Sequence, residues 1–481
     1  MGRIVVVGAG LGAMAAAARL AIAGHTVTVY ERTSTYGGAV GRFERDGFAF
    51  DTGPGLLHLP AVYRDLFVKT GKKPLEECVG LSQVDPAARH LFADGTRVDL
   101  PNASRAGTLA ALDAALGAGA GERWGEFLVR AREAWDRTRR PLLEEPQPAD
   151  PEALAREPYP ALKAGLLQRR TRTLAQVGER ELRDPRLIAL LDSYAEAYGF
   201  PAASAPASAV VLPYMEQTFG SWYVAGGIRA LAEAVYERCR ERRVEFVFDA
   251  PVDEVLTEGE GAGERALGVR LESGETVEAD HVVVGAPVPE LYREQVLPWR
   301  YSDEWTHFQR HGTSRMTVLL ALRGAREEGA AHRTVVHGAD GGPTVTVLRP
   351  DDPALRPDAG HEAVTVSALV HGLPAEERQE LAARMVEAAA RAVPGLAERL
   401  LWQEVRTPED VRAATGTAEV PGPALADARG EWLPAPNLSP MTGLYYAGGW
   451  SHPGGGLAHA GMSGALVAGL IVEGAEFRGS Q

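Results

Sequence analysis

The first 31 residues constrain the fold of this chain most, because a glycine-rich turn stands between two short apolar segments. Ile4–Val7 is a β-branched run, typical of a strand buried on both faces, and residues 25–30 predict a second strand. The alanine-rich segment between them predicts a helix over about 11–23, which Gly24 ends where a positive φ is often required. This order predicts a βαβ unit with a right-handed crossover, and therefore an α/β protein.

The glycine-rich turn itself reads GAGLGA and has the composition of a dinucleotide phosphate loop. Gly8 permits a tight turn, Gly10 lets the backbone approach a pyrophosphate, and Ala13 is small enough for close helix–strand packing. The free N–H groups and the dipole at the helix start favour an anion. Glu31 ends the second strand, where a ribose ligand is expected, with Arg32 beside it. A glycine-rich turn of another α/β protein is the alternative interpretation.

The segment after Glu31 helps to separate FAD from NAD, both of which are compatible with the unit so far. A plain NAD dehydrogenase would continue into a helix, whereas this chain has the doublet Gly37–Gly38, then Arg42, and then an Asp-x-Gly-Pro sequence at 51–54. Backbone without side chains at the doublet can pass close to a flavin or its ribityl chain. Ordinary loop glycines are the alternative here.

The remaining elements follow from composition and periodicity. Residues from about 107 to 201 are rich in Ala, Leu, Glu and Arg, so we expect mostly helices there. Gly274 lies in a turn that predicts a hairpin. The other predicted helices are 228–240, 375–393 and 462–472, and the predicted strands are 244–248, 252–256, 266–271, 275–279, 281–285, 316–322, 334–337, 344–348, 363–370 and 444–447.

Composition excludes several classes of protein. The formal net charge of −14 disfavours nucleic acid as the main partner. Cys78 and Cys239 are too few for a disulfide scaffold and lie in no CxxC or His/Cys cluster, so we predict inert thiols and no metal site. The apolar stretches 11–24 and 464–472 are too short to span a bilayer, and no targeting segment is recognisable. We therefore expect a cytoplasmic protein, and peripheral membrane contact stays open.

Two ends of the chain resemble one family. The sequences GAGLGA, YERTSTYGGAVGRF and GFAFDTGPG resemble the start of the FAD-dependent phytoene (carotenoid) desaturases, which are amine-oxidase-like flavoproteins. The C-terminal GLYYAGGWSHPGGG, residues 443–456, resembles the signature of the same family. Ala39 stands where many members have arginine, and Ser451 where they have threonine. Whether the substrate is a carotenoid, a retinoid or another polyene therefore stays open.

The resemblance implies FAD as cofactor and a set of residues that contact it. Val252 would face the adenine through its backbone, and the C-terminal glycines would line the ribityl chain and the isoalloxazine. The implied cofactor-binding residues, with the adjacent Arg32, are Gly8, Gly10, Gly12, Ala13, Glu31, Arg32, Gly37, Gly38, Arg42, Val252, Gly448, Gly449, Gly454 and Gly455.

One cofactor can meet both ends only if the chain returns to its first domain. We therefore predict a discontinuous Rossmann-like FAD-binding domain with an α+β substrate domain. The predicted FAD-binding domain comprises residues 1–105, 215–290 and 420–481, and the substrate domain comprises 106–214 and 291–419.

The expected activity is that of an FAD-dependent oxidoreductase which dehydrogenates an extended apolar or polyene substrate, free or bound to a carrier protein. A hydride would pass to flavin N5 while the protein positions the reactants. The alternatives are a redox-neutral polyene isomerase using reduced flavin, an amine oxidase, and a flavin-binding protein without turnover. The oligomeric state is not predicted.

His452 is the candidate catalytic residue, because it is the titratable side chain of the turn that the resemblance places at the flavin. A histidine that only shapes the loop is the alternative, and His58 and His459 are weaker candidates. Trp450 and Tyr223 could wall an apolar tunnel or belong to the core.

A basic patch at 169–172 is expected to be a solvated helix face or a contact for lipid or a carrier protein.

Overall fold

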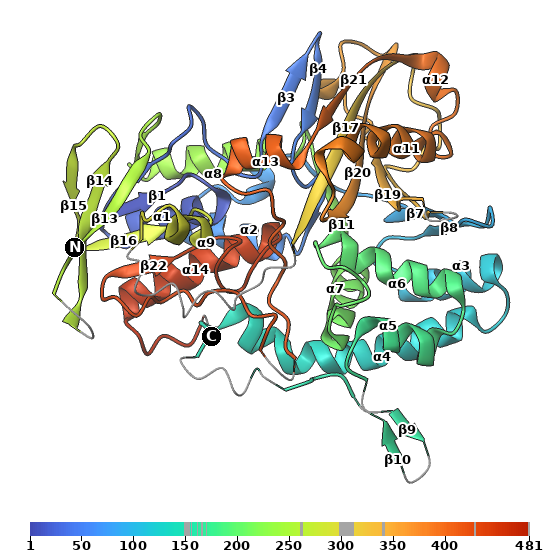
Figure 1. Cartoon of the computed structure of the whole chain (residues 1–481), viewed down its shortest axis with the longest axis horizontal. Helices are drawn as coiled ribbons and strands as arrows, with labels where there is room; N and C mark the ends of the chain where they lie inside the picture. The colour runs from blue at the N-terminus through green and yellow to red at the C-terminus, as the bar shows by residue number, and fades with distance from the viewer. Residues whose placement is uncertain are drawn as a thin grey trace.

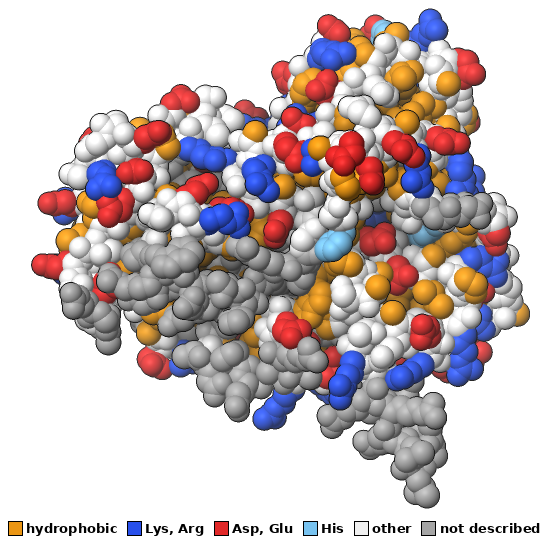
Figure 2. Space-filling view, viewed as in Figure 1, with side chains coloured by type: hydrophobic (Ala, Val, Ile, Leu, Met, Phe, Trp, Pro, Cys, Tyr) orange, Lys and Arg blue, Asp and Glu red, His pale blue; other side chains and the backbone are white. Residues whose placement is uncertain are grey.

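The computed structural model describes residues 1–148, 154, 156–160, 162–164, 167–169, 171–259, 263–297, 312–338, 342–427 and 430–479. Figure 1 shows a parallel sheet on the left, a second sheet at the upper right and a group of helices at the lower right. On the face shown in Figure 2, acidic and basic side chains are interspersed over both the left and the right half of the molecule. Among the described residues, no helix has the length and apolar character that crossing a membrane requires.

The parallel sheet is built from strands that lie far apart in the sequence. Its order is β12-β2-β1-β16-β22, with β1 in the centre. Val5 of β1 pairs with Thr28 of β2 on one side and with Val282 of β16 on the other. The strands are β1 (Arg3–Val7), β2 (Thr26–Tyr30), β12 (Glu245–Val247), β16 (His281–Val284) and β22 (Leu444–Tyr446). The predicted βαβ unit is confirmed, and this α/β arrangement brings both ends of the chain together.

Two layers cover this sheet. On one face lie α1 (Leu11–Ile22), α8 (Ile228–Glu241) and α14 (Leu457–Glu473), whose apolar side chains share one core with those of β1. On the other face, Val5 and Val7 pack with the antiparallel sheet of β13 (Val252–Glu258), β14 (Arg265–Leu271) and β15 (Thr276–Glu278). The strand β1 is therefore buried on both faces, as its β-branched sequence predicts.

The second sheet has seven strands in the order β21-β17-β20-β19-β18-β7-β8. The helix α11 (Arg378–Ala390) packs on it, and its apolar side chains form one core with those of the strands. The bounds are β7 (Ala88–Leu91), β8 (Arg97–Leu100), β17 (Thr313–Arg323), β18 (Arg333–Val336), β19 (Val345–Leu348), β20 (His361–His371) and β21 (Leu400–Arg406). The predicted domain division stays a prediction. Residues 88–100, which that division assigns to the FAD-binding domain, belong to this second sheet, because β7 pairs with β18 and β8 pairs with β7.

The helical group confirms most of the predicted helical region. It contains α3 (Arg105–Leu116), α4 (Ala120–Arg139), η2 (Arg140–Glu144), α5 (Leu174–Val177), η4 (Gly178–Leu182), α6 (Pro185–Ala197), η5 (Ala207–Val210) and α7 (Val211–Phe219). The helix expected at the basic patch is wrong, because Arg169 lies in a strand. There β9 (Leu162–Ala164) and β10 (Leu167–Arg169) pair antiparallel, which uses the backbone groups that a helix would need. Arg170 lies outside the described residues.

The remaining short elements connect these layers. The sheet β5-β11-β6 matters most for the site, since it lies between the parallel sheet and the helical group. The bounds are β3 (Arg42–Arg45), β4 (Phe48–Asp51), β5 (Leu57–His58), α2 (Ala61–Thr70), η1 (Leu75–Glu77), β6 (Leu81–Gln83), β11 (Ser221–Val224), α9 (Val288–Arg293), η8 (Pro353–Leu355), η9 (Ala375–Glu377), α12 (Leu396–Arg399) and α13 (Pro408–Thr415).

Candidate functional site

The turn between β1 and α1 has the geometry of a phosphate loop. Gly8 adopts a φ of +91°, and its N–H donates to the Tyr30 carbonyl oxygen at 2.8 Å. A Cβ built on Gly285, at the end of β16, would lie 2.4 Å from the Cβ of Ala13, so helix and strand pack as closely as the sequence predicts. A Cβ on Gly10 would meet only the Gly285 carbonyl oxygen, at 3.8 Å. The space in front of Gly10 is therefore open to a pyrophosphate.

Glu31 is buried directly beside this loop. Its Oε2 accepts a hydrogen bond from the Ala9 N–H at 2.7 Å, and its Oε1 accepts from the N–H and the Oγ1 of Thr33, both at 2.9 Å. Its backbone carbonyl accepts from the Ala250 N–H at 2.9 Å, which brings the start of β13, with Val252, to the same edge. Arg32 is exposed, and its Nη2 lies 3.4 Å from the Ala413 carbonyl oxygen of α13.

Arg229 of α8 holds the loop that carries the glycine doublet. Its Nη1 donates to the carbonyl oxygens of Tyr36 and Val40, and its Nη2 donates to the Thr35 Oγ1 at 2.7 Å. A Cβ on Gly37 would lie 2.4 Å from the Arg229 Nη1. The loop therefore needs glycine at this position whether or not a cofactor is bound.

The neighbouring Gly38 and Arg42 have different surroundings. A Cβ on Gly38 would lie 3.1 Å from the Cα of Gly10, so the doublet rests on the phosphate loop. The Arg42 Nη1 lies 3.3 Å from the Gly226 carbonyl oxygen, and its Nε pairs with Glu44 at 2.7 Å.

Asp51 caps the N-terminus of α8, a role that sequence reasoning missed. Its Oδ2 accepts from the Ile228 N–H at 2.8 Å, and its Oδ1 accepts from the Arg229 N–H at 3.1 Å. Burial raises the pKa of this carboxyl to about 6, against the opposing effect of the two N–H groups. A Cβ on Gly227 would lie 2.6 Å from the Asp51 Oδ2. The glycine at 227 therefore lets the carboxylate of the Asp-x-Gly-Pro sequence reach the start of α8.

The C-terminal turn meets the phosphate loop at Gly12. A Cβ on Gly12 would lie 2.5 Å from the Cα of Gly448, so this glycine permits α1 to approach the turn. Gly448 itself is held by its N–H, which donates to the Ser463 Oγ at 3.0 Å. On its other side, a Cβ on Gly448 would meet only the Gly285 carbonyl oxygen at 3.8 Å. Gly10 and Gly448 thus face open space beside the same carbonyl, as one extended cofactor requires.

The other glycines of the turn pack against residues 421–424. A Cβ on Gly455 would lie 1.8 Å from the Pro421 carbonyl oxygen, and one on Gly454 would lie 2.5 Å from the Gly422 carbonyl oxygen. A Cβ on Gly449 would lie 3.2 Å from the Pro421 Cγ. These glycines therefore have a packing role, and their contact with a cofactor stays a prediction.

Three polar atoms of His452 have partners in the protein, whereas its buried Nδ1 has no hydrogen-bond partner among the described residues. Its Nε2 lies 2.9 Å from the Glu145 carbonyl oxygen, its N–H donates to the Ala435 carbonyl oxygen at 2.6 Å, and its carbonyl oxygen accepts from Asn437 at 2.6 Å. Burial lowers the pKa of its imidazole to about 4. These contacts favour the alternative in which His452 shapes the turn; its catalytic role stays a prediction.

A small pocket with a mainly apolar lining and a cavity volume of about 20 Å³ lies beside this turn. Pro423 and Ala424 form the wall nearest the turn, since the Ala424 N–H donates to the Pro453 carbonyl oxygen at 2.8 Å. The pocket is lined by Trp135, Thr138, Arg139, Leu142, Leu143, Ser208, Val211, Leu212, Met215, Pro423, Ala424, Leu425, Ala426 and His459. Trp450 and Tyr223 are not among these lining residues, and the Tyr223 hydroxyl donates to the Asp352 Oδ2 at 2.7 Å.

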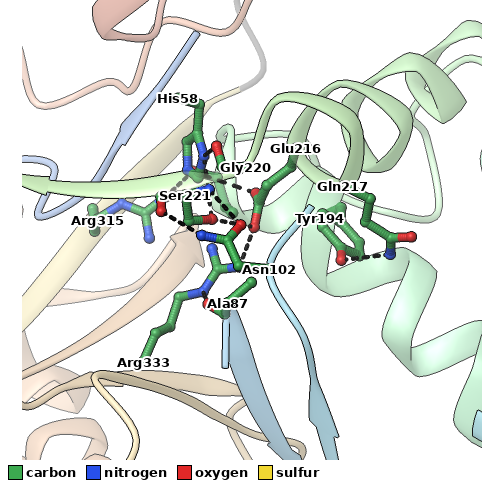
Figure 3. Close-up of polar contacts among 11 residues, drawn as sticks. His58, Ala87, Asn102, Tyr194, Glu216, Gln217, Gly220, Ser221, Arg315 and Arg333 are labelled. Atoms are coloured by element: carbon green, nitrogen blue, oxygen red, sulfur yellow. Dashed lines mark hydrogen bonds and ion pairs between the residues drawn. The ribbon is translucent and has the colours of Figure 1, made fainter. Parts of the chain in front are cut away.

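The other weaker candidates and the cysteines can also be placed. His459 is buried, which lowers the pKa of its imidazole to about 4. His58 lies in β5, within a group of polar side chains (Figure 3). Cys78 is exposed, and Cys239 is buried, which raises the pKa of its thiol. Among the residues that the structure describes, no three His, Cys, Asp or Glu side chains form a metal-binding group.

Comparisons with known proteins point to one family. The sequence profile of the flavin containing amine oxidoreductases matches residues 13–472. A 4,4'-diapolycopene oxygenase of Methylomonas sp is 29% identical over 499 residues, which are 98% of this chain and 98% of the relative. A zeta-carotene-forming phytoene desaturase of Myxococcus xanthus is 33% identical over 340 residues, which are 70% of this chain and 63% of the relative.

Solved structures share the fold. An oxidoreductase from Methanosarcina mazei has a TM-score of 0.67 at 16% identity, covering 97% of this chain and 99% of that chain. A putrescine oxidase bound to putrescine has a TM-score of 0.65 at 18% identity, covering 98% of this chain and 99% of that chain. These likenesses confirm the predicted α/β class with a Rossmann-type FAD-binding fold.

Proposed function

The chain belongs to the flavin containing amine oxidoreductase family and is an FAD-dependent oxidoreductase, and on this premise we propose that it dehydrogenates an extended apolar polyene. Its fold and cofactor are those expected from the phosphate loop and the C-terminal turn. The proposal concerns the substrate class and the type of reaction.

The observation that carries the proposal is the apolar pocket beside the glycine turn. Its lining contains Trp135, Leu142 and Met215 from the helical group, opposite the segment 423–426. An extended hydrocarbon gains about 25 cal/mol for each Å² of apolar surface that it buries in such a lining. A small hydrophilic amine would gain little there, so the apolar lining favours a hydrocarbon over an amine.

The names of the relatives support the same class of substrate. One relative is named for phytoene and zeta-carotene and the other for 4,4'-diapolycopene, all carotenoids. The word oxygenase in the second name favours oxygenation of a polyene as a second candidate function.

When bound, FAD would supply the acceptor for the hydride that the substrate loses. The role proposed for the residues of this chain is to bind the cofactor and to orient the substrate beside it. The open backbone at Gly10 and Gly448 would leave room for the cofactor, and the apolar lining beside the turn would contact the substrate.

The proposal is tested by mixing the flavin-loaded protein, without oxygen, with phytoene in liposomes. We expect the absorbance of the oxidised flavin to disappear and a product with two hydrogens fewer to form. Bleaching that never occurs with phytoene or any coloured carotenoid contradicts the proposal. With the flavin reduced beforehand, a product of unchanged mass indicates the isomerase. A product that gains oxygen in air indicates the oxygenase, and bleaching by amines indicates an amine oxidase.

A matched pair of variants links the reaction to the pocket. Leu142→Trp fills part of the pocket, whereas Val129→Trp adds the same side chain at an exposed position of α4, where Val129 is 46% exposed. We expect the first variant to slow bleaching and the second to leave it unchanged. Equal rates in both variants would contradict binding in this pocket.

A further inference from the structure

Arg229, the second residue of α8, attaches the loop with the glycine doublet to this helix. Its guanidinium donates to the carbonyl oxygens of Tyr36 and Val40 and to the Thr35 Oγ1. The guanidinium also lies over the Tyr36 ring, 4.1 Å from the ring centroid. One side chain therefore contacts both ends of the segment 35–40, and the position of this segment depends on that of α8.

The part of α8 that carries Arg229 is itself fixed. The Asp51 Oδ1 of β4 accepts a hydrogen bond from the Arg229 N–H at 3.1 Å. Two helical turns further along α8, the Tyr236 ring stacks on the Tyr36 ring, with centroids 4.1 Å apart and planes inclined by 9°. The guanidinium is therefore presented from a rigid element, and a second side chain of the same helix contacts the same loop.

The opposite side of the glycine doublet rests on the phosphate loop. The Gly37 N–H donates to the Ala9 carbonyl oxygen at 2.8 Å, and a Cβ on Gly38 would lie 3.1 Å from the Gly10 Cα. Gly10 faces the open space in which a pyrophosphate is expected. The doublet therefore lies between Arg229 and the phosphate loop, so a shift of the doublet would change the space left for the pyrophosphate.

Arg229 also brings a positive charge to this place. Its guanidinium donates to two carbonyl oxygens and a hydroxyl, and no carboxylate among the described residues forms a direct ion pair with it. Asp51 contacts its backbone N–H instead. Arg42, the other arginine near the doublet, differs, because its Nε pairs with the Glu44 Oε1 at 2.7 Å. A cation fixed beside the phosphate loop attracts the pyrophosphate of a dinucleotide, which is negatively charged.

We propose that Arg229 is a positioning residue for FAD, which holds the glycine doublet against the phosphate loop and supplies a positive charge for the pyrophosphate. The role concerns the binding of the cofactor, so it depends neither on the substrate nor on the reaction proposed above. The sequence around the doublet does not reveal it, because Arg229 follows Tyr36 by 193 residues.

The test is a fluorescence titration of the apoprotein with FAD. Arg229→Met keeps an unbranched apolar side chain but removes the guanidinium, so the dissociation constant for FAD should rise roughly tenfold to a hundredfold. Arg240→Met is the matched control, because Arg240 lies on the same helix, 5.9 Å from the Tyr236 ring centroid, and pairs with Glu237 at 3.6 Å. The control should bind FAD as wild type does. An unchanged constant in Arg229→Met overturns the inference.

Two further measurements separate this role from a general effect on the fold. Competition by ADP, which contains the adenine, ribose and diphosphate parts of FAD, should weaken in Arg229→Met, whereas competition by adenosine should keep its strength. Added salt should weaken FAD binding less in Arg229→Met than in wild type, because the charge is missing. Adenosine and FAD binding that weaken by the same factor would show that Arg229 acts only through the fold, and would contradict the inference.

Arg229→Lys is the second variant, in case Arg229→Met does not fold. It keeps the charge but lacks the planar group that reaches three oxygens at once. We expect a melting temperature of the apoprotein close to that of wild type and an intermediate dissociation constant for FAD. A folded lysine variant that binds FAD as tightly as wild type contradicts the part assigned to the guanidinium. Bleaching by phytoene enters none of these measurements, so the inference and the proposed function can fail separately.

Discussion

The cradle formed by the two glycine turns and the wall formed by His58, Glu216 and Arg333 are built in opposite ways. In the cradle, backbone meets backbone: a Cβ on Gly12 or Gly455 would lie 2.5 Å or less from another chain segment. In the wall, long side chains from β5, α7 and β18 meet in a buried group, in which Arg333 donates to Glu216 (Figure 3). The cradle depends on the absence of side chains and the wall on their charges. Different substitutions should therefore damage the two regions.

The largest effect is expected for Gly455→Ala. The new Cβ would lie 1.8 Å from the Pro421 carbonyl oxygen, a clash that only a backbone shift can relieve. We expect the free energy of unfolding to fall by about 3 kcal/mol, and FAD to be lost. Gly263→Ala is the control, since a Cβ there meets nothing within 4 Å. Denaturant titration with and without added FAD measures both effects, and equal stability of the two variants would refute the packing role of Gly455.

A comparable loss of stability, but without loss of FAD, is expected for Glu216→Leu in the wall. It leaves Arg333 buried without its ion-pair partner, which typically costs about 3–5 kcal/mol. The double variant Glu216→Leu with Arg333→Met removes both charges and should recover most of this loss. A double variant less stable than the single variant would show that the ion pair does not carry the stability of the wall. FAD binding should persist in all folded variants, in contrast to Gly455→Ala.

These two regions also show which parts of the fold and the site can be predicted from the sequence. The phosphate loop, Glu31 and the C-terminal turn could be recognised because a backbone-made site needs glycines at fixed local spacing. The hairpin at Gly274 and the buried strand β1 were also predictable from local sequence, the first from its turn glycine and the second from its β-branched run. The Asp51 cap on α8 and the pairing of Glu216 with Arg333 could not be predicted, because topology alone brings these residues together from distant segments. The helix expected at Arg169 was wrong because strand pairing overrode a composition typical of helices.

Glu31→Ala should affect cofactor binding more than the fold. Loss of a charge-assisted hydrogen bond to the ribose weakens FAD binding by about 1.5–3 kcal/mol, or roughly tenfold to a hundredfold in affinity. Glu245→Ala is the matched control, because it removes an exposed glutamate from β12, the strand paired with β2. Fluorescence titration of the apoprotein with FAD gives both dissociation constants. An unchanged constant for Glu31→Ala would mean that Glu31 serves only the Ala9 and Thr33 contacts seen in the fold.

The effect that is smallest at neutral pH, and grows only in acid, concerns the turn at His452. Burial lowers the pKa of His452 and of His459 to about 4, below the usual value near 6.5. The unfolded chain therefore binds more protons between these values, so stability is fully present above pH 6.5 and falls as the pH drops towards 4. The loss is about 1.4 kcal/mol per pH unit for each histidine that stays neutral. Denaturant titrations from pH 7 to pH 4.5 should show that the free energy of unfolding falls less steeply with pH in His452→Gln than in wild type. Identical slopes would contradict a buried, neutral His452.

The central claim is that the protein removes two hydrogens from a polyene and passes the electron pair to its own FAD. The most direct measurement is a single turnover without oxygen, in which bleached flavin and product are both counted by spectroscopy and mass spectrometry. The account predicts one molecule of product, lighter by two hydrogens, for each FAD bleached. Product formed while the flavin stays oxidised, or bleaching without any product of lower mass, would contradict it.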